Sequence, residues 1–170
     1  MQAKEHILVY PGGGREVMKN DGEQYQLIWK ERTGFARMAM QHGYDIVPFA
    51  AIGADDAFDI HYDANDFQQS AVGQLFRKSG ISEKYLRGGD AFAPITTGLG
   101  LLPRPEKFYF AFGERISTSA LMNDADDKAS QWQVREQVAA SIYGLMEDLF
   151  AIREKDQATW PTWRKKLTGR

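Results

Sequence analysis

A glycine-rich loop is the part of the sequence whose residue types and spacing could do chemistry. The apolar run His6–Tyr10 is typical of a buried strand, and it ends at the loop Pro11-Gly12-Gly13-Gly14-Arg15-Glu16. Glycines let the backbone approach a ligand, and backbone amides with an arginine can bind an oxyanion or a phosphate. The loop lacks the Lys-Ser/Thr of a P-loop, and Val17 occupies the third glycine position of the dinucleotide motif. A nucleotide loop is therefore excluded, whereas a substrate-binding loop and a plain tight turn are both compatible with these residues.

A second spacing of interest is His61-x-x-x-x-Asp66, because a histidine oriented by an aspartate is a common general base. The two residues lie in a polar segment, without a small apolar frame around them. A solvated loop histidine is the favoured interpretation, and we do not expect His61 and Asp66 to form a working catalytic pair.

Two elements after the loop predict the fold class. Residues 33–42 have apolar positions at helical spacing, with Thr33 as a possible N-cap and Gly43 as the stop. Residues 45–53 form a nearly continuous apolar strand that ends at Asp55-Asp56. Strand, helix and strand in this order predict a βαβ unit, and hence an α/β fold with a mostly parallel sheet flanked by helices. Asp55 and Asp56 then follow a parallel strand, where ligands often bind, although plain solvation is the favoured interpretation.

The remaining sequence predicts one domain and a tail. Residues 59–90 are polar and mixed and are expected to form helix and loop, and residues 107–113 form an aromatic strand. A long amphipathic helix follows, with apolar residues stepping by threes and fours from Val134 to Ile152. We predict a single domain over residues 1–155 and a charged tail over residues 156–170.

Composition excludes several classes of protein. A net charge of −2 argues against nucleic acid as a partner, and the absence of cysteine excludes disulfides and thiolate metal sites, so no metal site is predicted. No apolar run approaches the roughly 20 residues needed to cross a bilayer. We expect a cytoplasmic protein, with peripheral membrane contact as an open alternative because Trp160 and Trp163 lie near Lys165 and Lys166.

Several further motifs follow the glycine loop in a fixed order. They are Tyr25–Lys30, Gly34–Ala39, Ile46–Gly53, Leu102–Pro105 and Phe108–Ile116. Together with the loop, this succession resembles the glycerolipid acyltransferase family that includes lysophosphatidate acyltransferases, and within it the diacylglycerol acyltransferase-like and phytyl ester synthase-like branch. The resemblance covers about residues 7–153. It implies a fold of the glycerol-phosphate acyltransferase type.

The resemblance also implies a function. Members transfer a fatty acyl group from a thioester, either acyl-CoA or acyl carrier protein, to a lipid alcohol such as diacylglycerol, and they need no other cofactor. Their His-x-x-x-x-Asp pair precedes the glycine loop, so we expect this chain to be the C-terminal half of the domain, without a catalytic residue. His61 and Asp66 follow the loop, which is the wrong order. Gly12, Gly13, Gly14, Arg15 and Glu16 would bind substrate, and Gly13, where glycerophosphate enzymes carry glutamate, favours a neutral acceptor.

Two other classes of function were weighed against this one. A non-catalytic lipid-binding half-domain of the same fold would keep the loop without the chemistry. A small hydrolase would need a Gly-x-Ser-x-Gly elbow, which the sequence does not contain.

Overall fold

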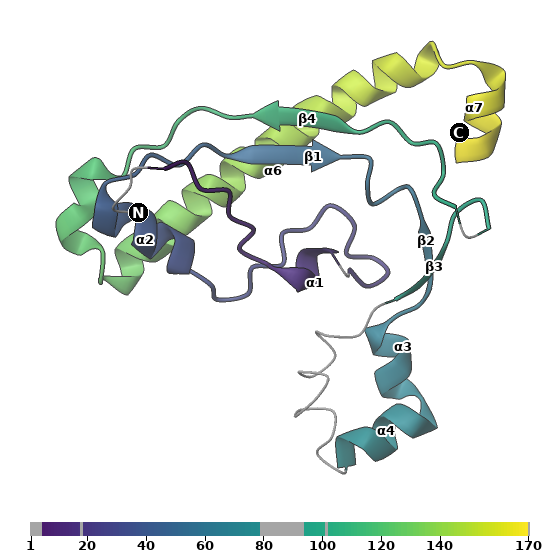
Figure 1. The fold of residues 1–170 in the computed structure, drawn as a ribbon, viewed down its shortest axis with the longest axis horizontal. Helices are drawn as coiled ribbons and strands as arrows, with labels where there is room; N and C mark the ends of the chain where they lie inside the picture. Colours follow the sequence, from purple (N-terminus) through teal and green to yellow (C-terminus); the bar gives the residue numbers. More distant parts are fainter. Residues whose placement is uncertain (1–4, 18, 79–93, 101, 170) are drawn as a thin grey trace. The chain divides into compact units, whose positions relative to one another are not determined.

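The computed structural model describes residues 5–17, 19–78, 94–100 and 102–169 (Figure 1). Its helices are α1 (Gly14–Val17), α2 (Gly34–His42), α3 (Ala64–Gln69), α4 (Ala71–Lys78), α6 (Lys128–Ala158) and α7 (Thr162–Thr168), with a 3-10 helix η2 (Ser119–Asp124). Its strands are β1 (Phe49–Ile52), β2 (Asp59–Tyr62), β3 (Ile95–Thr97) and β4 (Tyr109–Phe112). Contacts within the chain divide it into two compact units, which are described separately.

The predicted mostly parallel sheet is wrong. The described strands form two antiparallel pairs, β1 with β4 and β2 with β3. The run His6–Tyr10 is not a strand, and its apolar side chains are at least half exposed, from Val9 at 50% to Leu8 at 70%. The physical reason is that an apolar run indicates a strand but does not say which strand will pair with it. In the structure, Phe49–Ile52 pairs with Tyr109–Phe112 and not with the N-terminal segment.

Unit 1 comprises residues 1–11, 29–52 and 108–159, and its core lies between the β1–β4 pair and α6. In Figure 1, α6 runs behind this pair. Alternate residues of β1, Ala50 and Ile52, are buried, as expected for a strand with one covered face. The opposite face carries Phe49, whose ring stacks on Phe110 at a centroid distance of 5.8 Å. The long helix predicted around residues 134–152 is confirmed as α6.

The helix predicted over residues 33–42 is also confirmed, as α2. It ends at Gly43, whose φ of 61° lies in the left-handed region that favours glycine. Thr33 does not cap the helix with its side chain. Its hydroxyl instead donates to Oε1 of the buried Gln131 at 2.7 Å, which ties α2 to α6. A buried polar pair of this kind specifies how the two helices meet, because leaving either group unsatisfied is costly.

Unit 2 comprises residues 12–28, 53–107 and 160–170 and holds the glycine loop. The β2–β3 pair is followed by Arg104, whose N–H donates to the carbonyl of Ala57 at 2.9 Å. The last helix, α7, is anchored by Arg164, which stacks over the buried Trp160 and donates to the carbonyl of Pro105 at 2.9 Å. Residues 160–169 are therefore packed against the rest of this unit. The predicted boundary between residues 155 and 156 stays a prediction.

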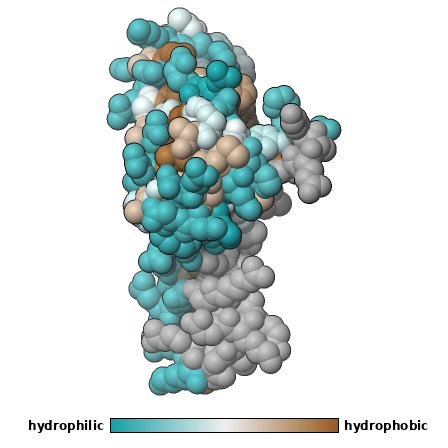
Figure 2. Space-filling view, turned by 90° about the vertical axis from the view of Figure 1, so that its left-hand side faces the viewer, coloured by the Kyte–Doolittle hydropathy of each residue, from teal (hydrophilic) through white to brown (hydrophobic). Residues whose placement is uncertain are grey.

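Two surface observations bear on the surroundings of the protein. Hydrophilic residues predominate on the face shown in Figure 2, with a few apolar residues among them. Within the part of the chain that is described, no helix has the length and apolar character needed to cross a membrane. The predicted cytoplasmic location stays a prediction.

Candidate functional site

Glu16 holds the glycine loop in its conformation. Its carboxylate folds back over the loop, where Oε2 accepts the N–H of Gly12 at 3.0 Å and Oε1 accepts the N–H of Ile28 at 3.3 Å. A Cβ at Gly12 would lie 2.1 Å from Cγ of Glu16, so any other residue at position 12 would displace the Glu16 side chain from this position. Gly13 has a φ of +59°, which also favours glycine. Glycine is therefore favoured at positions 12 and 13 for different reasons: the position of the Glu16 side chain at Gly12, and the backbone conformation at Gly13.

Arg15 forms an ion pair with Glu23. Its Nη2 donates to Oε1 at 2.6 Å and at still closer range to Oε2. Glu23 also accepts the N–H of Asn20 at 2.7 Å, so the carboxylate is fixed by the turn that contains it. The Arg15 side chain is only 10% exposed. The guanidinium is consequently held in one place beside the loop.

Residues 19–25 join this loop to the segment that follows β1. Asp55 accepts from Nζ of Lys19 at 2.7 Å and from the N–H of Tyr25 at 2.8 Å. The Tyr25 hydroxyl donates to Asp56 and accepts the N–H of Gly53 at 3.2 Å. Tyr25 has a φ of 60°, a conformation that costs a bulky residue about 1–2 kcal/mol and persists only where its surroundings enforce it. The Asp55 and Asp56 side chains are thus structural anchors, and the interpretation of plain solvation is wrong for both.

Asp63 connects the same turn to α3. It caps that helix by accepting the N–H groups of Asn65 at 2.7 Å and Asp66 at 3.0 Å, and it accepts the N–H of Asp21 at 2.9 Å. Burial favours the protonated form of this carboxyl group. Those backbone N–H groups and the nearby charge of Arg15 outweigh burial and hold the pKa of Asp63 below its ordinary value of 3.8.

His61 and Asp66 have different partners. His61 lies on β2 with its Nε2 2.6 Å from the hydroxyl of Thr97. Asp66 lies in the first turn of α3, where its carboxylate accepts the N–H of Asp63 at 3.0 Å and completes a capping box. Both side chains therefore have local structural roles.

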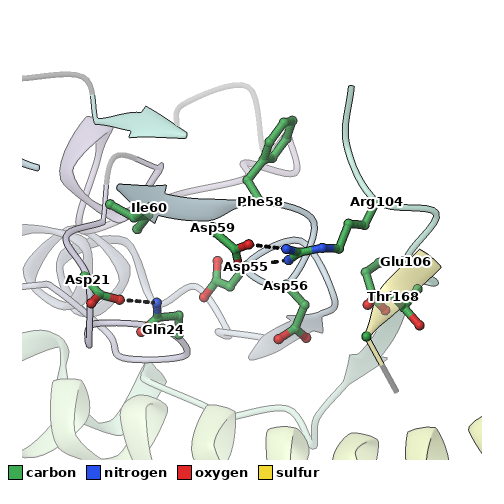
Figure 3. Close-up of a pocket in the computed structure, with 11 residues that line it drawn as sticks. Asp21, Gln24, Asp55, Asp56, Phe58, Asp59, Ile60, Arg104, Glu106 and Thr168 are labelled. Carbon is green, nitrogen blue, oxygen red and sulfur yellow. Dashed lines mark hydrogen bonds and ion pairs between the residues drawn. The ribbon is translucent and has the colours of Figure 1, made fainter. Parts of the chain in front are cut away.

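An open polar hollow of about 510 Å³ lies in unit 2 (Figure 3). Its lining includes the carboxylates of Asp21, Asp55, Asp56, Asp59 and Glu106. Figure 3 shows the guanidinium of Arg104 directed at Asp59, with which it forms a bidentate ion pair. The hydrogen bond from Arg104 lowers the pKa of Asp59 from its ordinary value. A polar, charged lining of this kind suits water and cations better than an acyl chain, and among the described residues no group of three or more His, Asp or Glu side chains could hold a metal ion.

Comparison with known proteins identifies the family. The family model described as diacylglycerol acyltransferase matches residues 1–150, which include the glycine loop and its partners. The chain belongs to this family. The resemblance of the sequence to diacylglycerol acyltransferase-like proteins is thereby confirmed.

Individual relatives of this family member are longer proteins. The chloroplastic phytyl ester synthase 1 of Arabidopsis thaliana is 33% identical over 168 aligned residues, which cover 92% of this chain and 23% of the relative. The human 2-acylglycerol O-acyltransferase 3 is 24% identical, covering 77% of this chain and 38% of the relative. No solved structure matches the chain. The chain thus spans about a quarter of the length of the phytyl ester synthases it matches.

The structure shows that further residues support the glycine loop, and the sequence motif did not indicate them. Glu23 forms an ion pair with Arg15, and Asp55 accepts hydrogen bonds from Lys19 and from the N–H of Tyr25. Asp63 accepts the N–H of Asp21 in the turn that precedes Glu23. The only sequence signal for this arrangement was Gly22, a turn residue whose φ of 80° places Glu23 after a tight bend. The assignment of Gly12–Glu16 as substrate-binding residues stays a prediction.

The depressed pKa of Asp63 predicts how unit 2 responds to acid. A carboxyl group whose pKa is lowered by folding contributes stability above its unfolded value of 3.8, and this contribution is lost as the pH falls through the folded pKa. Thermal unfolding between pH 6 and about pH 2.5 should therefore show a smaller acid-induced loss in Asp63→Asn than in the wild type. Asp126→Asn, at a carboxylate that is 85% exposed, is the control and should behave like wild type. Equal acid sensitivity of Asp63→Asn and the wild type would contradict the role of Asp63.

Proposed function

We propose that this chain is part of an O-acyltransferase that moves a fatty acyl group from an acyl thioester to the hydroxyl of a lipid alcohol. The observation that carries the proposal is the fixed conformation of the glycine loop, which lies inside the segment that matches the family. The Glu16 carboxylate accepts the N–H of Gly12, and Arg15 is paired with Glu23. The names of the relatives support it. They are phytyl ester synthases, a 2-acylglycerol O-acyltransferase and a wax alcohol acyltransferase, and each name refers to the making of an ester.

In the proposed reaction, the acceptor oxygen attacks the thioester carbonyl. The new bond joins this oxygen to the acyl carbon, the carbon–sulfur bond breaks, and the hydroxyl proton leaves through a general base to the departing thiolate. The role proposed for this chain is binding: Arg15 and the backbone of Gly12, Gly13 and Gly14 would hold the polar end of a substrate. Glu16 would act by holding the loop, since its carboxylate is occupied by the N–H groups of Gly12 and Ile28.

The co-substrate in this proposal is acyl-CoA or an acyl-loaded carrier protein, and no other cofactor is required. The acceptor is a lipid alcohol, and diacylglycerol, phytol and fatty alcohols are the candidates that the names of the family and its relatives suggest. Such acceptors reside in lipid phases. Contact of the complete protein with a membrane surface is therefore part of the proposal.

Arg15 offers a test of the loop's role. In the complete native protein, Arg15→Gln should raise the KM for the lipid acceptor about tenfold, because the substitution removes a fixed charged donor from the binding loop. The matched control is Arg37→Gln, since Arg37 is half exposed and pairs with Asp126 in unit 1. Steady-state kinetics with acyl-CoA and diacylglycerol would measure both. Identical kinetics for the two variants would contradict the proposal that the loop binds substrate.

A further inference from the structure

The two sequence segments that form and support the glycine loop carry more acidic than basic side chains, and one of the acidic residues, Asp59, is paired with Arg104 from outside them. Residues 12–28 carry two basic and three acidic side chains, and residues 53–63 carry four acidic side chains and no lysine or arginine, which gives a net charge of −5. The chain as a whole has a net charge of only −2. Acidic residues are thus concentrated in the segments that form and support the loop.

Both cations of the loop segment already have acidic partners. Arg15 is paired with Glu23, and Lys19 is paired with Asp55 at 2.7 Å. The charge of Arg15 also acts on Asp63, whose pKa it helps to lower. These two cations are therefore balanced within the protein, and the loop has no surplus of positive charge with which to attract a phosphate.

Glu23 is held more firmly than a surface ion-pair partner. The N–H of Asn20 donates to the same carboxylate at 2.7 Å, and Asn20 is itself buried. The Glu23 N–H and carbonyl also belong to the local turns, bonded to the carbonyl of Asn20 and the N–H of Gln26. Because its backbone and carboxylate are both fixed, Glu23 sets the position of the Arg15 guanidinium as well as its net charge.

From this geometry we propose that Glu23 is a specificity-determining residue: it positions Arg15 and balances its charge, so that the loop accepts an uncharged lipid alcohol and disfavours an acceptor that carries a phosphate. The inference rests on the proposed function for the meaning of "acceptor". Its electrostatic part concerns the loop alone.

Binding of a small phosphate tests the electrostatic part without any catalysis. Glycerol 3-phosphate titrated into the complete native protein should bind about tenfold more tightly to Glu23→Gln than to the wild type, because one carboxylate beside Arg15 has lost its charge. Glu23→Asp keeps the charge and should behave like the wild type. Glu154→Gln, at an exposed position of α6, gives the same change in net charge and should have no effect. The gain should disappear in Arg15→Gln/Glu23→Gln.

Acceptor preference tests the same residue during turnover. Lysophosphatidate should gain about tenfold in kcat/KM relative to diacylglycerol in Glu23→Gln, through a lower KM. Unchanged phosphate affinity and unchanged acceptor preference in Glu23→Gln would overturn the inference, as would an equal gain in Glu154→Gln. If no ester forms with any acceptor but Glu23→Gln still binds glycerol 3-phosphate more tightly, the proposed function fails and the charge-balancing role of Glu23 holds.

Discussion

Replacing Gly12 by alanine is expected to disrupt the glycine loop and lower kcat/KM of the complete protein at least tenfold. The added Cβ would lie 2.1 Å from Cγ, 2.3 Å from Cδ and 2.5 Å from Oε2 of Glu16, so the carboxylate must leave its place. Its hydrogen bonds to the N–H groups of Gly12 and Ile28 would be lost. Hydrogen bonds to a charged group contribute about 1.5–3 kcal/mol each, and because this site is only partly buried we expect a total loss of about 2 kcal/mol in unfolding free energy. Urea unfolding and steady-state kinetics measure the two effects.

The neighbouring glycine is the matched control for this substitution. A Cβ at Gly14 would meet nothing within 4 Å of the protein, so the unfolding free energy of Gly14→Ala should be within about 0.5 kcal/mol of the wild type. Glu16→Ala removes the obstacle itself, so adding Gly12→Ala to it should cost little more. Strict additivity of Gly12→Ala and Glu16→Ala in this double-mutant cycle would contradict the proposed contact between them.

Trp29→Ala is expected to destabilise unit 1 by about 3–5 kcal/mol, the usual range for truncating a buried tryptophan. The Trp29 side chain is 2% exposed and packs edge-on against Phe35 at a centroid distance of 5.3 Å. The guanidinium of Arg135 also lies over the Trp29 ring, 5.5 Å from its centroid. Removing the indole leaves a cavity that these neighbours fill only in part. Because whole-domain stabilities are about 5–15 kcal/mol, this loss is a large fraction of the total, and the urea midpoint of the variant should fall well below that of the wild type.

A tryptophan on the surface provides the comparison for this prediction. Trp163 is 59% exposed on α7, and Trp163→Ala should shift the unfolding free energy by less than about 1 kcal/mol. Circular dichroism during urea unfolding would measure both variants. Similar stability of Trp29→Ala and Trp163→Ala would show that Trp29 is not a core residue of unit 1.

Local elements of the fold could be predicted from the sequence, and the pairing of strands could not. The helix at Gly34–His42 follows from apolar spacing and the stop at Gly43, which are properties of neighbouring residues. The partner of β1 lies in β4, far along the chain, and nothing in the run Phe49–Ile52 names it. We expected one parallel sheet that included the N-terminal run. The structure instead has two antiparallel pairs, because β1 pairs with β4 and the N-terminal run forms no strand.

The candidate site, too, could be predicted from the sequence only in part. The loop Gly12–Glu16 was found because a cluster of glycines before Arg-Glu is visible in a few consecutive residues. The partners of the loop are acidic residues on turns, such as Glu23 and Asp63, and acidic residues on turns are usually solvated. Their roles depend on contacts between Arg15 and Glu23 and between Asp21 and Asp63, which are eight and 42 positions apart. Only the folded chain brings these groups together.

Ester formation by the complete native protein tests the central claim most directly. The protein would be incubated with radiolabelled acyl-CoA and diacylglycerol, phytol or a fatty alcohol, and the labelled ester and the free thiol of CoA would be measured together. We predict equal amounts of ester and thiol with at least one acceptor, unchanged in Arg37→Gln and at least tenfold lower in Gly12→Ala. Binding of the lipid alcohols without ester or thiol would contradict the claim and identify a lipid-binding protein of the same family.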